Sequence, residues 1–288
     1  WMALFSQNML EMSVELTALD PSYEDMVVKF VDHFYFIAAA MNTPGADSMW
    51  DDEDGFYYDL LRLPNGSSQL LKVRSLVGLL PLCATTVIEP EQRNRVPRAM
   101  EFIKERQRRI PELVKAIHPT GEGNFGVADR GIFALLDRDR LTRVLTRMLD
   151  ENEFLGSHGI RSISKFHKNN PYIFHVNGEE FRVDYLPAES NTGMFGGNSN
   201  WRGPVWMPIN ALIIRALLQF HLYYGDNFKI ECPTGSGKMM NLFEVSKEIA
   251  DRLIGIFTSD ENGKRPVYGG AEKFQNDPHW KEYILFYE

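Results

Sequence analysis

The chain has 288 residues, of which 44% are hydrophobic, so it can bury a sizeable core as one large domain or two ordinary ones. The formal net charge of −8 argues against a nucleic-acid partner, because no basic stripe accompanies the aromatic residues. Two cysteines are too few for a disulfide framework, and the longest apolar run, residues 76–88, is too short to span a bilayer. These features predict a cytoplasmic protein with no membrane partner.

The N-terminal part carries two helical patterns. Apolar side chains recur at helical spacing over residues 2–19, and Asp20-Pro21 then ends the pattern. A second stripe covers residues 27–41. Two helices joined by so short a turn predict an antiparallel hairpin. Because the first pattern is already periodic at Trp1, we expect this residue to lie inside a longer protein.

An acidic turn follows at residues 51–54, and a β-hairpin is predicted after it from the Pro-Asn-Gly turn between two short apolar runs. The four acids do not fit a calcium loop, since Trp50 would stand at the first ligand position. Two interpretations stay open. Either the turn is solvated and its carboxylates cap local backbone, or a carboxylate such as Asp54 faces a cleft beside Trp50 and Tyr58. Calcium at this turn also stays open.

Helical patterns dominate the remainder of the chain. We expect helices over residues 98–109, 141–149 and 245–257. Asp137 or Asp139 begins the second of them, and Asn241 with Glu244 forms a capping box before the third. Only hairpin-sized strands are predicted between the helices, and no solenoid period is present. The sequence therefore predicts an all-α barrel or bundle whose long loops gather at one end.

A turn rich in glycine and asparagine, residues 196–200, leads directly into the side chains of Trp201, Arg202 and Trp206. Pro204 suits the first turn of a helix, and apolar positions continue beyond it at helical spacing. Two interpretations again stay open. Either both indoles are core and Arg202 pairs with a carboxylate, or the indoles cover a pyranose ring whose hydroxyls bind Arg202.

Two other patterns are rejected as sites. Residues 233–238 resemble a phosphate loop, but Cys232 stands where glycine is needed and Met239 where Ser or Thr is needed. The seven histidines show neither an HExxH pattern nor pairs four residues apart, so we predict no metal site and no cofactor. Each is expected to be structural, although His158 is placed to line a cleft from the loop at residues 155–164.

Hydrolysis of a glycosidic bond would need two carboxyl groups, one on each side of the bond. The candidates for these carboxyl groups are the acidic residues in aromatic, loop-like surroundings, namely Asp51, Asp54, Asp184, Glu189 and Glu288. Their spacing in the sequence does not show which two would act as the catalytic pair.

Five motifs carry a resemblance to a known family. They are WDDEDGFYYD (50–59), GIRSISKFH (159–167), YLPAES (185–190), GGNSNWRGPVW (196–206) and HWKEYILFYE (279–288). In this order they resemble glycoside hydrolase family 63, which includes processing α-glucosidases and bacterial mannosylglycerate and glucosylglycerate hydrolases. That family has an (α/α)6 barrel and inverts anomeric configuration. The resemblance implies an all-α, six-hairpin-type helical toroid, incomplete here, with residues 1–288 as a single domain from its C-terminal part.

The resemblance also implies roles for individual residues. Glu288 matches the general base that polarises the attacking water, while Trp201 and Trp206 match sugar-pocket tryptophans. Asn200 occupies a position that is aromatic in some relatives. The base must be ionised and must face the side of the sugar opposite the leaving group. The candidate site thus comprises catalytic Glu288 and the substrate-binding residues Trp50, Asp54, Tyr58, Asn200, Trp201, Arg202 and Trp206.

The family's general acid, an Asp in a Trp-Asp motif followed closely by Phe, has no counterpart here. The surroundings of Trp50-Asp51 match a different family segment. We therefore expect a piece of a larger enzyme, with the acid upstream and the remaining barrel helices of the parent chain as its partner. The piece alone is expected to show no turnover and to expose an apolar flank where those helices pack.

The sequence thus predicts a glycoside hydrolase. Its expected reaction is the inverting, exo-acting hydrolysis of terminal α-linked glucose or mannose from oligosaccharides or small glycosides. Two alternatives stay open: a carbohydrate-binding helical toroid without catalysis, or a helical protein-interaction scaffold whose aromatic residues are interface anchors.

Overall fold

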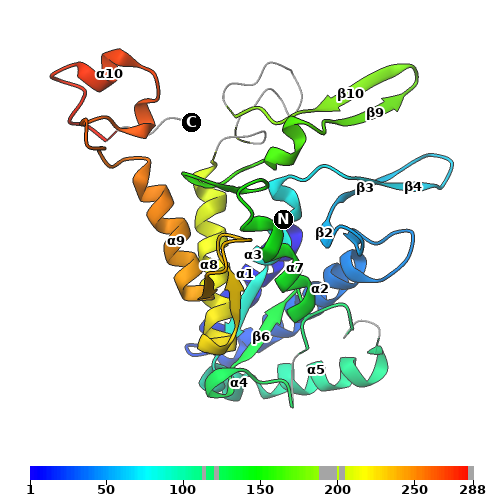
Figure 1. Cartoon of the computed structure of the whole chain (residues 1–288). Helices are drawn as coiled ribbons and strands as arrows, with labels where there is room; N and C mark the ends of the chain where they lie inside the picture. The colour runs from blue at the N-terminus through cyan, green and yellow to red at the C-terminus, as the bar shows by residue number, and fades with distance from the viewer. Residues whose placement is uncertain (112–114, 120–122, 188–199, 201–204, 285–288) are drawn as a thin grey trace.

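The computed structural model describes residues 1–111, 115–119, 123–187, 200 and 205–284, and its secondary structure is mixed (Figure 1). Helices make up 48% and strands 17%. Within the described residues the strands form six two-stranded antiparallel sheets. The fold is therefore mixed, with helices and small antiparallel sheets, and the expected all-α toroid is wrong.

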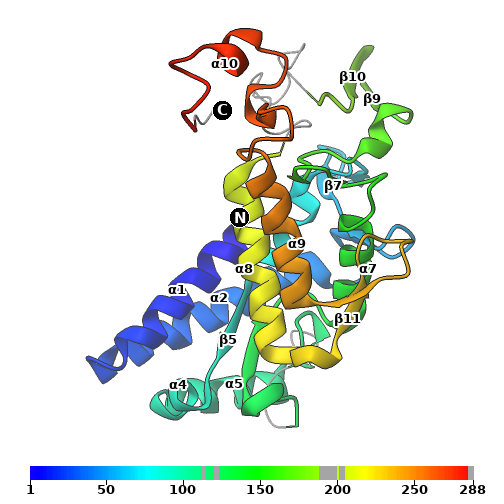
Figure 2. The same cartoon turned by 60° about the vertical axis from the view of Figure 1, so that its left-hand side comes forward.

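The first two helices form the predicted antiparallel hairpin. α1 spans Met2–Leu16 and α2 spans Glu24–Asn42, joined through a 3-10 turn at Pro21–Tyr23. Asp20 caps this turn by accepting a hydrogen bond from the N–H of Ser22 at 2.8 Å. The two helices pack along one another and form one edge of the molecule (Figure 2).

A buried two-stranded sheet that the sequence analysis missed lies among the helices. β5 (Thr85–Ile88) pairs antiparallel with β6 (Gly131–Ala134), and every residue of both strands is buried. α1 and α8 (Met207–Tyr224) contact β5, while Phe133 of β6 lies edge-on to two aromatic rings of α2. Short, fully buried strands cannot be told from buried helix by periodicity alone, which is why the prediction failed here.

The three later helices predicted over residues 98–109, 141–149 and 245–257 occur close to those positions, as α5, α7 and α9. The remaining described helices are α3 (Leu80–Cys83), α4 (Pro90–Arg95), α5 (Pro97–Arg109), α7 (Arg138–Met148), α9 (Leu242–Gly255) and α10 (Glu272–Asn276). Asp137 caps α7 by accepting from the N–H of Arg140 at 2.8 Å. α8 begins at Met207 rather than at Pro204, which lies outside the described residues. α9 packs on α8, and both helices reach the candidate site.

Five small hairpins complete the described fold. They are β1 (Trp50–Asp51) with β2 (Phe56–Tyr57), β3 (Asp59–Arg62) with β4 (Ser68–Leu71), β7 (Leu155–Gly156) with β8 (Gly159–Ile160), β9 (Tyr172–Val176) with β10 (Glu179–Val183), and β11 (Lys229–Glu231) with β12 (Met239–Asn241). The hairpin predicted after the acidic turn is confirmed as β3–β4. It and β9–β10 extend on the same side of the molecule in Figure 1.

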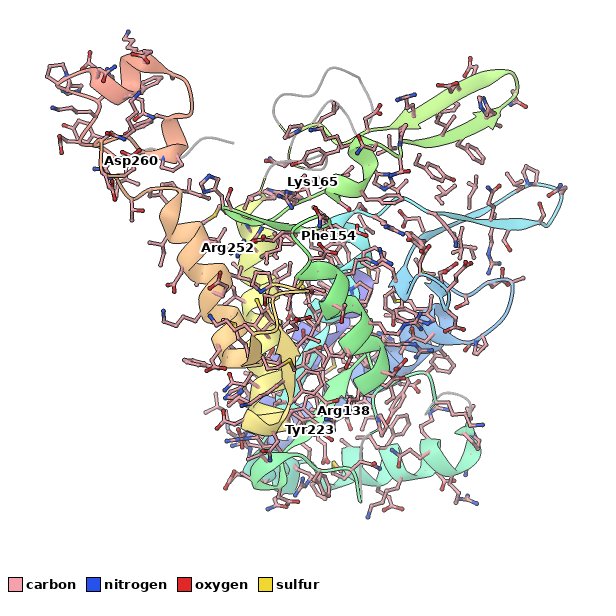
Figure 3. The ribbon with its side chains drawn as sticks, in the orientation of Figure 1. Arg138, Phe154, Lys165, Tyr223, Arg252 and Asp260 are labelled. Carbon is pink, nitrogen blue, oxygen red and sulfur yellow. The ribbon has the colours of Figure 1, made fainter. Side chains whose placement is uncertain are left out.

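The core joins most of these elements. Phe154, just before β7, is fully buried and stacks on Phe56 with ring centroids 5.6 Å apart (Figure 3). Cys83 and Cys232 are both buried and are not joined in a disulfide. No helix in the described part of the chain has the length and apolar character needed to cross a membrane.

Candidate functional site

The candidate pocket is built around the tight turn between β7 and β8, whose tip is formed by Ser157 and His158. Gly159 closes the turn at φ +123°, a conformation that side chains rarely adopt. A Cβ at Gly159 would meet Leu253 of α9 at 2.8 Å and Val205 at 3.1 Å. The absence of a side chain therefore lets the turn pack directly against α9 and the segment before α8.

A buried amide on α8 holds this turn in place. Asn210 accepts a hydrogen bond from the N–H of Ile160 at 2.8 Å and donates to the carbonyl of Ile160 at 3.0 Å. It also donates to the carbonyl of Trp206 at 3.0 Å. The amide therefore satisfies β8 as a neighbouring strand would, and fixes the first turn of α8 to it. The sequence analysis missed Asn210, although a single Asn inside an apolar helix was an available signal.

Two arginines stabilise the segment that leads into the turn. Arg161 donates from Nη1 to three carbonyl oxygens of residues 151–155, at 2.8 to 3.2 Å. Its backbone also bridges to Val205. From α9, Arg252 donates to the carbonyl of Gly156 at 2.8 Å (Figure 3). The turn is thus held by contacts from two helices and from its own preceding segment.

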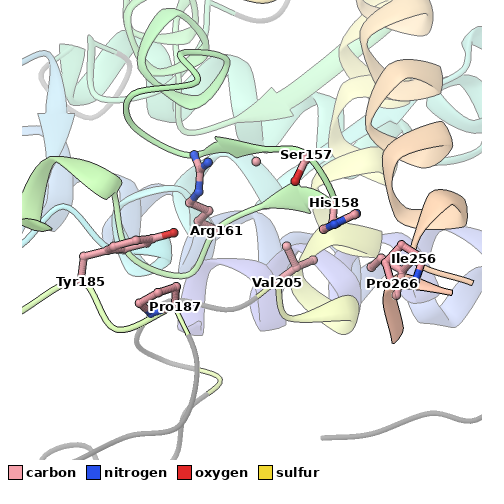
Figure 4. A pocket seen from close by; sticks show the side chains of 9 residues that line it. Ser157, His158, Arg161, Tyr185, Pro187, Val205, Ile256 and Pro266 are labelled. Carbon is pink, nitrogen blue, oxygen red and sulfur yellow. The ribbon is translucent and has the colours of Figure 1, made fainter. Parts of the chain in front are cut away.

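These contacts frame a pocket of about 330 Å³, which is within the range of small-molecule sites (Figure 4). The side chains that Figure 4 labels around it are Ser157, His158, Arg161, Tyr185, Pro187, Val205, Ile256 and Pro266. The prediction that His158 lines a cleft is confirmed. Among these described lining residues none is Asp or Glu, so any carboxylate that acts here must come from elsewhere.

The acidic turn lies at a different hollow, of about 370 Å³, which Asp54 lines. Lys72 lies 2.8 Å from Asp51 and 3.2 Å from Asp54, and Arg74 lies 3.1 Å from Asp54. Burial opposes ionisation of Asp54, but hydrogen bonds from Lys72 and Tyr58 and the two cationic charges outweigh it. The pKa of Asp54 is therefore lowered, and its carboxyl group is held ionised.

Glu153 extends these contacts into an ion-pair cluster, formed by Asp51, Asp54, Lys72, Arg74, Arg147 and Glu153. Its carboxylate lies 2.6 Å from both Arg74 and Arg147 and accepts a hydrogen bond from the hydroxyl of Ser164. Within this cluster each of the three acidic groups is paired with at least one basic group. Within the described residues, no group of three or more His, Cys, Asp or Glu side chains could hold a metal ion.

Trp50 and Tyr58 are core residues, with exposed fractions of 6% and 3%. The indole N–H of Trp50 donates to Asp52 at 2.6 Å, and two arginines of α7 lie over its ring. The hydroxyl of Tyr58 donates to Asp54 at 3.1 Å. Both rings are therefore engaged in internal contacts, and neither lines the pocket at the β7–β8 turn.

The other predicted site residues lie near the pocket or outside the description. Trp206 is half-buried against the core at the start of α8, directly after Val205 of the pocket. Asn200 is also half-buried. Trp201, Arg202 and Glu288 lie outside the described residues.

The phosphate-loop lookalike binds an anion from its own chain. The N–H of Gly235 donates to the carboxylate of Glu231 at 2.8 Å, and that of Gly237 donates to it as well. These bonds lower the pKa of Glu231. The backbone donors that would bind a phosphate are thus already used, which supports the rejection of a nucleotide site.

Comparison with known proteins finds a relative of substantial sequence identity. No protein-family model matches the chain. The chain is 43% identical, over an alignment of 307 residues, to "Uncharacterized protein YMR196W" of Saccharomyces cerevisiae. The alignment covers the whole of this chain and 28% of the relative, so the chain spans under a third of that protein's length.

Proposed function

We propose that this chain is part of an inverting, exo-acting α-glycosidase that removes terminal α-linked glucose or mannose from oligosaccharides or small glycosides. One observation carries the proposal. Three of the five motifs that resemble glycoside hydrolase family 63 meet at one pocket, through Arg161, Tyr185 with Pro187, and Val205. These residues are far apart in the sequence, and no local pattern requires them to converge on a cavity of ligand size.

The pocket offers groups suited to a sugar ring. Tyr185 supplies an aromatic ring for the apolar face of a pyranose, while His158 and Ser157 supply hydrogen-bonding groups for its hydroxyls. Arg161 uses Nη1 to bind backbone carbonyls, so its main role is to hold the turn in place. In this proposal the pocket is one wall of a subsite that Trp201, Arg202 and Trp206 complete.

The reaction requires two carboxyl groups that this pocket does not itself supply. We assign the general base to Glu288, following the family resemblance. No residue here matches the family's general acid, so we assign that role to another part of a longer chain, of the kind the yeast relative represents. The base would deprotonate water on one face of the sugar while the acid protonates the leaving oxygen on the other.

The first test uses Glu288→Gln in a longer protein that contains these 288 residues. The unmodified protein should hydrolyse an aryl α-glucoside or α-mannoside with inversion, seen as the β-anomer in the first NMR spectra. The variant should lose roughly 10²-fold or more in kcat but still bind the sugar. The 288-residue chain alone should show no turnover. Retention of configuration, or full activity of the variant, would contradict the proposal.

The second test asks whether the pocket at the β7–β8 turn binds sugar. Glucose, mannose and methyl α-glucoside are titrated into the chain, and His158→Ala should weaken binding several-fold because a hydrogen bond is lost. The matched control is His175→Ala on the exposed face of β9, which should bind as the unmodified chain does. Absence of binding to every sugar would favour the protein-interaction alternative instead.

A further inference from the structure

α1 is apolar on two opposite sides. One side is buried against α2 and the central elements, through residues that include Ala3, Leu10 and Val14. The other side faces outward, yet it also carries large apolar side chains. The helix has two acidic residues, Glu11 and Glu15, and no basic ones. A helix with large apolar side chains on two opposite sides normally packs on both, so the outer side of α1 lacks a partner among the described elements.

The outer side carries a regular stripe, which we call the α1 seam. Its members are Met2, Phe5, Met9, Met12, Leu16 and, just beyond the helix end, Leu19. All except the half-buried Met9 are between 37% and 85% exposed. Successive members are spaced alternately by three and four residues, which is the spacing of a helix that packs along a second helix.

The α1 seam is also hollowed. A groove of about 560 Å³ is lined by Met12 and Leu16 together with Asn8, Glu11 and Glu15. Glu11 is held by Arg215 of α8 at 2.6 Å, and Glu15 accepts a hydrogen bond from Gln92. The groove therefore has an apolar floor and a polar, acidic rim, which matches an apolar side-chain ridge flanked by basic or polar groups.

We propose that the α1 seam is the docking site of an amphipathic α-helix from the part of a longer protein that lies outside these 288 residues. The relative that aligns along this entire chain is more than three times as long, because the alignment covers 28% of it, so such a protein has ample chain to supply the helix. α1 also lies along an outer edge of the described part of the molecule (Figure 2). The proposal does not depend on the glycosidase assignment.

The occupant has definable chemistry. It presents apolar residues at three- and four-residue spacing and a Lys or Arg opposite Glu15, and it crosses α1 at a shallow angle, about 20° in this class of packing.

Cysteine reactivity tests the proposal directly. Met12→Cys is introduced into the 288-residue chain and into the longer protein, and the rate of reaction with a small thiol reagent is measured. The native Cys83 and Cys232 are buried and give little background. The introduced thiol should react at least tenfold more slowly in the longer protein, with each rate referred to the same variant in denaturant. Met239→Cys is the matched control, since Met239 is 55% exposed and Met12 50%, and it should react similarly in both.

Two outcomes of the cysteine experiment would overturn the proposal. One is equal reactivity of the Met12→Cys thiol in both proteins. The other is protection of that thiol in the 288-residue chain that grows with protein concentration, which would identify a second copy as the occupant. Thermal unfolding supplies an independent readout. Met12→Lys should leave the melting temperature of the 288-residue chain unchanged and lower that of the longer protein, whereas an unchanged longer protein would also refute the docked helix.

Discussion

His167, the last residue of the motif at 159–167, shows how a single buried side chain links two segments. Its Nε2 accepts the N–H of Arg74 at 2.9 Å, so its Nδ1 carries the proton and donates to the carbonyl of Asn170 at 2.8 Å. Burial lowers the pKa of His167, and the nearby Arg74 charge acts in the same direction against the Asn170 bond. The imidazole is therefore neutral, and protonation would break its bond to Arg74.

This state predicts a loss of stability in mild acid. The pKa of His167 in the folded chain lies below the usual 6.5. Between these two pKa values the imidazole is protonated in the unfolded chain but neutral in the folded chain. The contribution of His167 is thus present above pH 6.5 and is lost as pH falls through the folded-state pKa, by at most about 1.4 kcal/mol per pH unit. Urea unfolding of His167→Gln between pH 7.5 and 5.5 should show a shallower pH dependence than the unmodified chain.

The control for this prediction is His175→Gln on β9, which should keep the original slope. His118 is also buried with a lowered pKa, so some pH dependence should survive in the His167 variant. An identical slope in the His167 variant and the unmodified chain would refute the neutral, buried assignment.

Individual residues were predictable from the sequence only where their role is local. His158 at a cleft and the caps Asp137 and Asn241 were found because the pattern around each one is short. Asn210 was not, since its partner Ile160 lies 50 residues away in the sequence. No propensity or periodicity encodes such a contact.

Among the elements, α9 follows its sequence signal most closely. Asn241 accepts the N–H of Glu244 at 2.9 Å, and Glu244 accepts the N–H of Asn241 at 2.8 Å, so the predicted capping box is confirmed. The same helix delivers Arg252 and Leu253 to the β7–β8 turn. A cap at one end of α9 thus helps to position the residues that shape the pocket at the other.

Removing this cap should destabilise the chain measurably. Asn241→Ala is expected to lower the free energy of unfolding by about 1 kcal/mol, because two backbone N–H groups of the first turn lose or loosen their partners. Asn241→Ser keeps the capping oxygen while removing the contact to Asp226, and should recover most of the loss in chemical denaturation. A serine variant as unstable as the alanine variant would assign the effect to Asp226 instead.

At the scale of the whole molecule, sequence patterns identified long helices and missed the fold class. Helices of 11 to 19 residues, such as α7 and α2, display several turns of periodicity. The strands have only two to five residues each, and β5 and β6 are buried on both faces. Such strands show no alternation, and their partners are fixed by tertiary packing rather than by local preference.

The candidate site likewise emerged only in part from the sequence. The motifs at 159–167, 185–190 and 196–206 contribute to one pocket, whereas Trp50, Asp54 and Tyr58 belong to a separate region of packed charges. Aromatic and acidic residues in a loop look alike in sequence whether they face a ligand or one another. Whether such an acidic residue is available to a ligand depends on which basic side chains pack against it in the folded protein, and here these are Lys72 and Arg74.

The ion-pair cluster around Glu153 has a consequence for how this protein can diverge over time. Losing Arg147 or Arg74 alone leaves the Glu153 carboxylate with only one of its two cationic partners and so weakens its charge compensation, whereas replacing acid and base together by apolar residues can be nearly neutral. A protein that acquires these substitutions one at a time passes through destabilised intermediates. The residues of the cluster should therefore change together or not at all, and an alignment of many homologues should show these positions covarying.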